Sequence, residues 1–188
     1  IKPGCNWVSF FPKIEQDFLK KLIVKNSNNL SEDCYIIFNH QNYGEEKSVK
    51  VHEYNFKDKV WSLGKLSTSI EWKNMCCYHL LNKCNESVEV EYTSTKINDI
   101  KKIKVNYKDN WIGFHYIEPT TIENAILEPP DGLIIKTIGN GNSNSNNSIN
   151  ISESNNRKWY PKNFEIIPGE GYCLYSPRNL DLKLGNTL

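Results

Sequence analysis

Six cysteines carry the widest range of chemistry in this chain, because a thiol can form a disulfide, bind a metal or act as a nucleophile. An even number in a chain of 188 residues is consistent with three disulfides. Neighbouring cysteines rarely bridge each other without strain, so Cys76 and Cys77 are expected to bond different partners. We therefore predict a disulfide framework. Its members are Cys5, Cys34, Cys76, Cys77, Cys84 and Cys173.

Other uses of the cysteines find less support in the sequence. The chain has no C-x-x-C pair, and its four histidines are not spaced as zinc ligands with the cysteines. A cysteine nucleophile would need a histidine beside it in space, and no local motif favours any one pair. The alternative that stays open is a set of reduced, buried thiols in an intracellular protein, since free Cys is among the most buried residue types.

Recognisable catalytic motifs are absent from the sequence. It contains no G-x-S-x-G, H-E-x-x-H, P-loop or dinucleotide fingerprint. The pairs Asp109-Asn110 and Asp131-Gly132 resemble fragments of calcium loops but lack the spacing of a full set of oxygen ligands. We predict a protein without enzymatic activity, metal or cofactor.

The composition excludes several classes of partner. Twenty-three Lys and Arg against 22 Asp and Glu give a net charge of +1, which is not the electrostatic footprint of a nucleic-acid binder. The apolar runs are too short to cross a bilayer, so we predict no transmembrane segment. Aromatic residues make up 12% of the chain, which favours a folded domain. Excess Asn and Lys with scarce Ala and Arg indicates an AT-rich coding sequence and lowers helix propensity.

Four N-x-S/T sequons permit N-glycosylation, at Asn29, Asn85, Asn146 and Asn150. Fifteen Ser and seven Thr among 188 residues would complete about three sequons with 25 Asn by chance, so four is no enrichment. The chain begins at Ile1 rather than Met, which fits a processed or an excised protein.

Aromatic residues are the remaining indication of function, because Trp and Tyr dominate protein interfaces and sugar platforms. Trp159 and Tyr160 closely follow a polar tract and are expected to be the most exposed aromatics of the chain. Residues 139–156 form that tract. It is rich in Asn and Ser and is predicted to be a surface loop.

The elements that must position these residues are mainly strands. One amphipathic helix is predicted over 13–25, with apolar residues at i, i+4 and i+8. About nine strands are predicted from alternating or short apolar runs. They lie at 34–38, 48–56, 60–66, 87–93, 103–107, 111–117, 133–138, 172–175 and 180–184.

Two segments are less regular. Residues 75–83 read as either a short helix or a cysteine-stapled loop. Residues 118–132 contain three Pro and read as a connection with a short helix near 121–127.

These patterns predict a single mainly β domain over 1–188, an antiparallel β-sandwich or barrel with one N-terminal helix. The predicted function is non-enzymatic protein binding at an extracellular, cell or virion surface, in adhesion, receptor binding or an attachment complex. A carbohydrate-binding module is the first alternative. An intracellular, cytoplasmic scaffold or accessory domain with reduced cysteines is the second.

Overall fold

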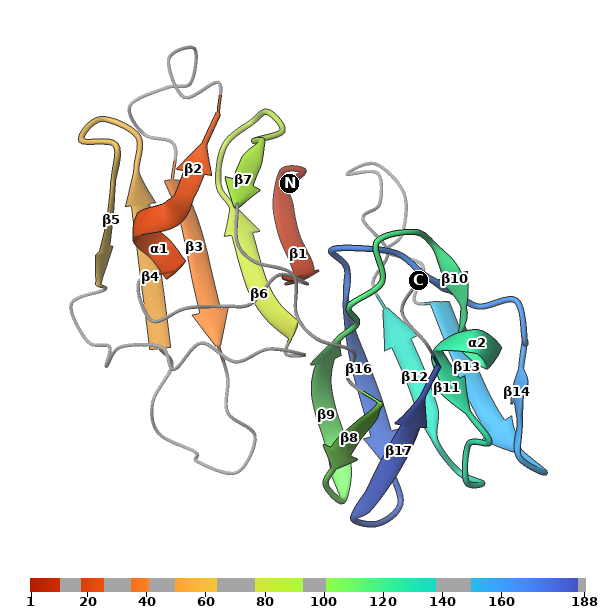
Figure 1. Ribbon diagram of the computed structural model, residues 1–188. Helices are drawn as coiled ribbons and strands as arrows, with labels where there is room; N and C mark the ends of the chain where they lie inside the picture. Colours follow the sequence, from red (N-terminus) through yellow and green to blue (C-terminus); the bar gives the residue numbers. More distant parts are fainter. Residues whose placement is uncertain are drawn as a thin grey trace.

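The computed structural model describes residues 1–10, 18–25, 35–40, 50–63, 77–92, 101–137 and 150–185. The protein is mainly β, and its described strands form several antiparallel sheets, none of which closes into a barrel. Figure 1 shows two groups of sheets lying side by side, one from the first half of the chain and one from the second. None of the helices in the described ranges is both long and apolar enough to cross a membrane.

The first half of the chain builds a five-stranded antiparallel sheet. Its order is β1 (Gly4–Ser9), β6 (Cys77–Asn82), β3 (Tyr35–His40), β4 (Lys50–Asn55) and β5 (Val60–Leu63). Strand β6 lies within the segment 75–83 that the sequence left between helix and loop. This segment is a strand in the structure. Strand β6 pairs with β1 on one side and β3 on the other, and this pairing gives its backbone N–H and C=O groups hydrogen-bond partners.

The predicted amphipathic helix over 13–25 is wrong, because only 18–21 among its described residues are helical. Helix α1 is a single turn, Phe18–Lys21, and the chain continues directly as strand β2, Leu22–Val24. Strand β2 pairs with β7, Val90–Tyr92, and Lys25 Nζ lies 2.6 Å from a carboxylate oxygen of Glu91. Ile23 and Val24 are β-branched and favour this extended pairing. Residues 13–17 of the predicted helix lie outside the described residues.

The small β2–β7 ribbon covers one face of the first sheet (Figure 1) and encloses an N-terminal core with it. The buried members of this core come from β2, β4, β6 and the loops beside them. They are Leu22, Val24, Tyr54, Phe56, Tyr78, Leu80, Cys84 and Val88.

The second half builds a further five-stranded sheet and two smaller ones. The large sheet has the order β14 (Lys158–Tyr160), β13 (Asn150–Asn155), β12 (Ile134–Thr137), β16 (Gly171–Ser176) and β9 (Lys108–Gly113). A three-stranded sheet has the order β11 (Ile126–Leu127), β17 (Leu180–Leu184) and β8 (Lys102–Val105). Strand β10 (Thr120–Thr121) pairs with β15 (Glu165–Ile166), and helix α2 (Ile122–Ala125) follows β10.

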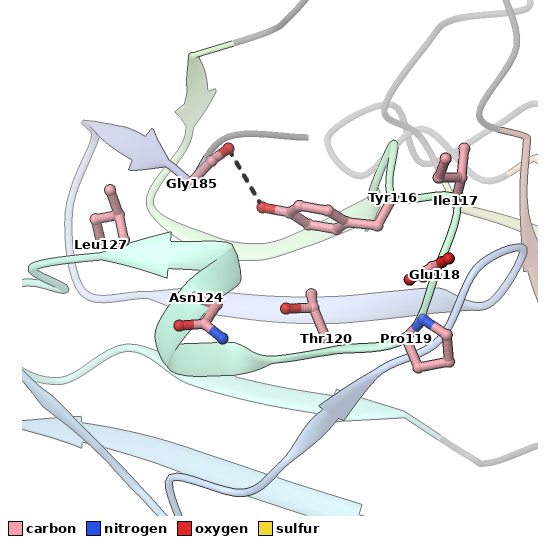
Figure 2. Close-up of a pocket in the computed structure, with 8 residues that line it drawn as sticks. All are labelled: Tyr116, Ile117, Glu118, Pro119, Thr120, Asn124, Leu127 and Gly185. Carbon is pink, nitrogen blue, oxygen red and sulfur yellow. Dashed lines mark hydrogen bonds between the residues drawn. The ribbon is translucent and has the colours of Figure 1, made fainter. Parts of the chain in front are cut away.

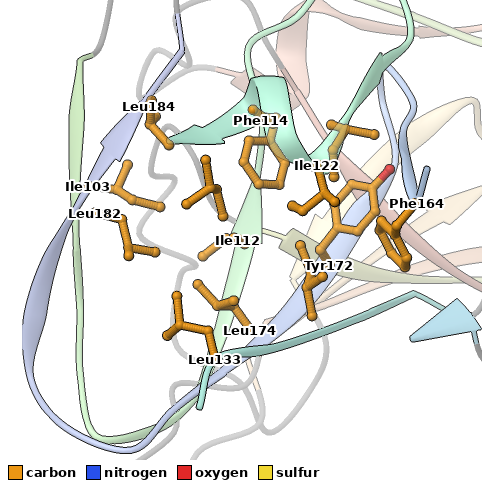
Figure 3. Close-up of a cluster of buried hydrophobic side chains, with 14 of the residues drawn as sticks. Ile103, Ile112, Phe114, Ile122, Leu133, Phe164, Tyr172, Leu174, Leu182 and Leu184 are labelled. Atoms are coloured by element: carbon orange, nitrogen blue, oxygen red, sulfur yellow. The ribbon is translucent and has the colours of Figure 1, made fainter. Parts of the chain in front are cut away.

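These sheets share one C-terminal core. Ile112 and Leu174 of the large sheet lie toward Ile103, Leu182 and Leu184 of the three-stranded sheet (Figure 3). Tyr172 packs at the other end of the cluster, against Phe114 and Phe164. Ile122 of helix α2, which is fully buried, closes one end of the cluster. The short helix that the sequence predicted near 121–127 is confirmed as α2.

Strand β13 corrects the prediction that 139–156 is a loop. Within the described part of that tract, Asn150–Asn155 is a strand between β12 and β14. Its Ser152 and Ser154 face the core and are buried, while Ile151 is 46% exposed. The buried hydroxyls are satisfied, because Ser152 Oγ donates to the Pro161 carbonyl at 2.9 Å and Ser154 Oγ donates to that of Pro130 at 2.7 Å. A polar strand can occupy this position because its polar atoms have partners.

Candidate functional site

The cysteines do not converge on one site. Among the described cysteines, Cys5 is exposed and Cys77, Cys84 and Cys173 are buried. No disulfide joins any two of these four, and Cys34 and Cys76 lie outside the described residues. The complete disulfide framework therefore stays a prediction.

The thiol of Cys173 is held in its protonated form. It lies on strand β16, fully buried, and shares a hydrogen bond with the side chain of Asp109 on strand β9. Burial, followed by the negative charge of Asp109, raises the pKa of Cys173 to about 12, although Lys136 acts in the opposite direction. Because a thiolate is the nucleophile and the metal ligand, Cys173 is unsuited to either role near neutral pH.

An aromatic seam joins the two halves of the protein. It consists of Trp7 on β1, His79 on β6 and Trp111 on β9. Trp7 and His79 are cross-strand partners with nearly parallel rings whose centroids are 5.9 Å apart. The Trp111 ring stands edge-on to both, with centroid distances of 4.6 Å to Trp7 and 4.5 Å to His79. Edge-to-face contacts of this kind add to the energy of burial.

Hydrogen bonds extend the seam from the end of β1 to residues 169–170, directly before β16. The Ser9 amide donates to the Gly169 carbonyl at 2.8 Å, and Ser9 Oγ donates to the Glu170 carbonyl at 2.7 Å. A Cβ at position 171 would overlap Cys77 Sγ and lie 2.9 Å from Cys77 Cβ, so the two halves meet here at a distance that only glycine permits.

The chemistry of the seam is neutral. Burial lowers the pKa of His79, so its imidazole is uncharged at neutral pH, as the thiol of Cys173 is. Within the described ranges, no three His, Cys, Asp or Glu side chains lie close enough together to hold a metal ion. The seam is thus a packed junction between two groups of sheets.

The large C-terminal sheet presents a second face to its surroundings, opposite the core. We call this the outer face. It is formed by Asp109, Ile134, Lys136, Ile151, Glu153, Tyr160 and Tyr175, which alternate with core residues along five strands. Trp111 and Cys173 lie on the same side of the sheet, but Trp111 packs in the seam and Cys173 has no exposed surface. The strand register places Tyr175 opposite Ile134, Ile134 opposite Glu153, and Glu153 opposite Tyr160. A continuous row of cross-strand neighbours therefore runs across the sheet.

Tyr160 is 56% exposed on this face, as the sequence predicted, but Trp159 is only 1% exposed. The prediction that Trp159 is exposed is wrong because side chains alternate along β14. Trp159 pairs with Ser154 on the core side, where its Nε1–H donates to the Ile126 carbonyl at 3.3 Å. Sequence analysis missed Ile134, Ile151 and Tyr175 as surface residues. The alternation within 133–138 and 172–175 is the signal that could have found Ile134 and Tyr175.

The described tryptophans do not build a flat sugar platform. Trp159 is buried, Trp61 packs against Tyr54, and Trp7 and Trp111 meet at an interplanar angle of 86°. Trp72 lies outside the described residues. Stacking on a sugar requires a ring face that is exposed, and coplanar Trp faces are not offered here.

The sequons differ in their setting. Asn85 is exposed in a turn that Asn82 holds, since the Cys84 amide donates to Asn82 Oδ1 at 2.9 Å. Asn150 is the first residue of β13, while Asn29 and Asn146 lie outside the described residues. Use of any of these sequons stays a prediction.

A pocket of about 380 Å³ lies beside helix α2, between the segment 116–120 and the end of strand β17 (Figure 2). The hydroxyl of Tyr116 at its edge shares its one proton between the Ala125 carbonyl at 3.2 Å and the Gly185 carbonyl at 3.5 Å. Glu118 and Asn124 are polar members of a largely apolar wall that contains no His or Cys. Such a lining suits the binding of an apolar group and has no acid–base pair.

The chain matches no protein-family model, and no curated protein or solved structure is significantly similar to it.

Proposed function

We propose that this chain is a non-enzymatic protein-binding domain of the β-sandwich type, displayed at a cell or virion surface within an adhesion, receptor-binding or attachment complex. The observation that carries the proposal is the outer face of the large C-terminal sheet. Its exposed Tyr160 and Ile151, with half-buried Ile134 and Tyr175 beside them, form an apolar surface on a rigid sheet.

The residue types on this face suit protein recognition. Tyr supplies a large contact area together with a hydroxyl that can bond in a wet interface, and it is frequent at energetically dominant positions of interfaces. Asp109, Lys136 and Glu153 interrupt the apolar residues with charges of both signs. Interspersed charges orient a partner and discriminate against wrong partners more than they add affinity.

The chemistry of the described residues supports binding over catalysis. The thiol of Cys173 is protonated, the imidazole of His79 is neutral and packed between rings, and the pocket beside α2 lacks an acid–base pair. These groups have the character of packing residues.

The test places a photoreactive phenylalanine analogue at position 160 and, as a matched control, at position 107. Tyr107 is also a tyrosine with 56% exposure, but it lies outside the outer face, in the turn between β8 and β9. In cells of the source organism, we expect position 160 to form one discrete adduct with another protein, which excess unmodified chain abolishes. Equal labelling from both positions, or an adduct only with a second copy of the chain, would contradict the proposal.

The runner-up is an intracellular accessory domain with reduced cysteines. It draws on one observation, the absence of a disulfide among the four described cysteines. The two functions are separated by counting free thiols. The protein is isolated from its source, denatured and alkylated, once with and once without prior reduction, and its mass is measured. Three disulfides would support the surface-displayed domain, and six alkylated thiols without reduction would replace it by the intracellular one.

A further inference from the structure

Both arginines of this chain lie at one pocket. The sequence has 21 Lys but only two Arg, Arg157 and Arg178. They are 21 residues apart in sequence, yet both line a pocket of about 550 Å³ at one end of the C-terminal sheets. The remaining lining residues are Pro130, Asp131 and Pro177.

The two guanidinium groups are available to a ligand. Among the residues that the structure describes, neither makes an ion pair or a side-chain hydrogen bond. Both residues are exposed, so no burial penalty has to be overcome for their charge. Since other basic positions of this chain use Lys, the choice of Arg at these two points favours a role that Lys performs poorly. Arg differs from Lys by its planar fork of donors, which bonds an oxyanion through two parallel hydrogen bonds.

Three loops are fastened together around the pocket. Asp131 Oδ1 accepts a hydrogen bond from the Arg157 amide at 3.1 Å, which ties the loop before β12 to the turn between β13 and β14. In that turn Arg157 has a φ of 57°, a conformation unusual for a residue other than Gly or Asn. Gly132, with a φ of 85°, brings the first loop against Pro177 of the third. Ser176 Oγ donates to the Arg178 carbonyl at 2.6 Å. The backbone that carries both arginines is thus fixed before any ligand arrives.

The charge of the pocket selects the ligand. Two guanidinium groups and the Asp131 carboxylate leave one net positive charge, which a monoanion neutralises and a dianion exceeds. The rings of Pro130 and Pro177 add apolar walls. From this combination we infer that the pocket binds an organic carboxylate, held by the guanidinium groups of Arg157 and Arg178. The inference stands apart from the proposed protein-binding function, because it concerns a different end of the sheet and needs no partner protein.

The low number of arginines makes the test direct. Arginine-selective ¹⁵N labelling of the full chain gives only two Nε–Hε signals, one for each residue. Benzoate is the probe carboxylate, methyl sulfate and inorganic phosphate are the competing oxyanions, and sodium chloride controls for ionic strength. We expect both signals to shift on titration with benzoate, with saturation and with the same dissociation constant.

Charge-conserving variants distinguish binding through the paired donors of the guanidinium group from binding through positive charge alone. In Arg157→Lys and in Arg178→Lys, the one remaining Nε–Hε signal reports on binding, and we expect at least tenfold weaker affinity for benzoate. Lys158→Gln, which removes the exposed neighbouring charge outside the pocket, is the matched control and should bind within twofold of the wild type. Amide spectra of the variants verify that the fold is retained.

The inference is overturned if the shifts grow linearly and equal those caused by chloride, or if only one arginine signal responds. It is also overturned if the Lys variants bind benzoate as tightly as the wild type. Affinity for phosphate or methyl sulfate at least tenfold above that for benzoate would reject the carboxylate as the ligand class.

Discussion

The two cores of this protein are built differently although both halves are antiparallel β. In the C-terminal half, three sheets and helix α2 enclose a cluster from several sides. Ile122, Ile135 and Leu174 in that cluster have no exposed surface. In the N-terminal half, one large sheet is backed by the short β2–β7 ribbon, and among the described residues of that core Tyr78 and Leu80 are the fully buried ones. A sheet gains most stability where a second layer of comparable size covers it.

The difference indicates where each half finds its stability. The C-terminal half relies on side-chain burial between layers. The N-terminal half also depends on its neighbour, because Trp7 and His79 pack against Trp111 across the seam. Substitutions in the C-terminal core should therefore lower the stability of the whole protein. Substitutions in the N-terminal core should mainly lower the stability of the N-terminal half.

The largest effect is expected from Trp159→Ala in the C-terminal core. Trp159 is 1% exposed, and its removal leaves a cavity and an unpartnered Ile126 carbonyl. The free energy of unfolding should fall by about 3–5 kcal/mol, measured by denaturant titration. The adjacent variant Tyr160→Ala is the control and should change it by less than about 0.5 kcal/mol. Similar losses for both variants would refute the placement of Trp159 in the core.

A second test compares the cores directly through Leu80→Ala. Leu80 is fully buried in the N-terminal core, so its truncation should cost about 2–5 kcal/mol. Hydrogen exchange should then accelerate at least tenfold more in β1, β3 and β6 than in β12 and β16. Equal acceleration in all five strands would show that the two halves unfold as one cooperative unit, as the single-domain prediction for 1–188 implies.

The seam between the halves is tested by Gly171→Ala. The added methyl group meets Cys77 Sγ and lies 3.1 Å from the Val8 amide nitrogen, so the free energy of unfolding should fall by about 1–3 kcal/mol. Cys77→Ala in the same chain removes the sulfur from the overlap and should restore part of the loss. Melting of the double variant at the temperature of Gly171→Ala alone would argue against this contact.

The smallest effect concerns the pH dependence of the seam. The pKa of His79 is lowered in the folded protein by burial, so the unfolded chain binds a proton more readily. The contribution of neutral His79 to the free energy of unfolding is therefore fully present above its unfolded pKa of about 6.5. It is lost as the pH falls below that value. The stability difference between wild type and His79→Phe should change between pH 7 and pH 5, in thermal melts at matched ionic strength. A difference independent of pH would show that the pKa of His79 is the same in the folded and the unfolded state.

Local patterns allowed much of the fold to be predicted. Nine predicted strands have counterparts in the described structure, because alternation and β-branched runs report directly on an extended chain with one buried face. The same patterns failed to predict the strand that contains Ser152 and Ser154. A polar run can form a buried strand when carbonyls elsewhere in the chain accept hydrogen bonds from its hydroxyl groups. Leu22–Val24 fitted a helical period and a strand equally well, and pairing with β7 decided between them.

The candidate surfaces were less accessible to prediction. Tyr160 was found from its position after a polar tract, but its row with Glu153, Ile134 and Tyr175 depends on the register of four strands. The pocket shared by Arg157 and Arg178 depends on loops that are separate in sequence.

The sequence by itself determined a neutral, aromatic-rich, mainly β protein, because composition and periodicity are local properties that each segment carries with it. It also determined the scarcity of arginine. The tertiary structure decided which strands pair, which aromatic residues are buried and where the two arginines meet. These depend on contacts between segments many residues apart, whose energies are realised only when the sheets have formed and packed.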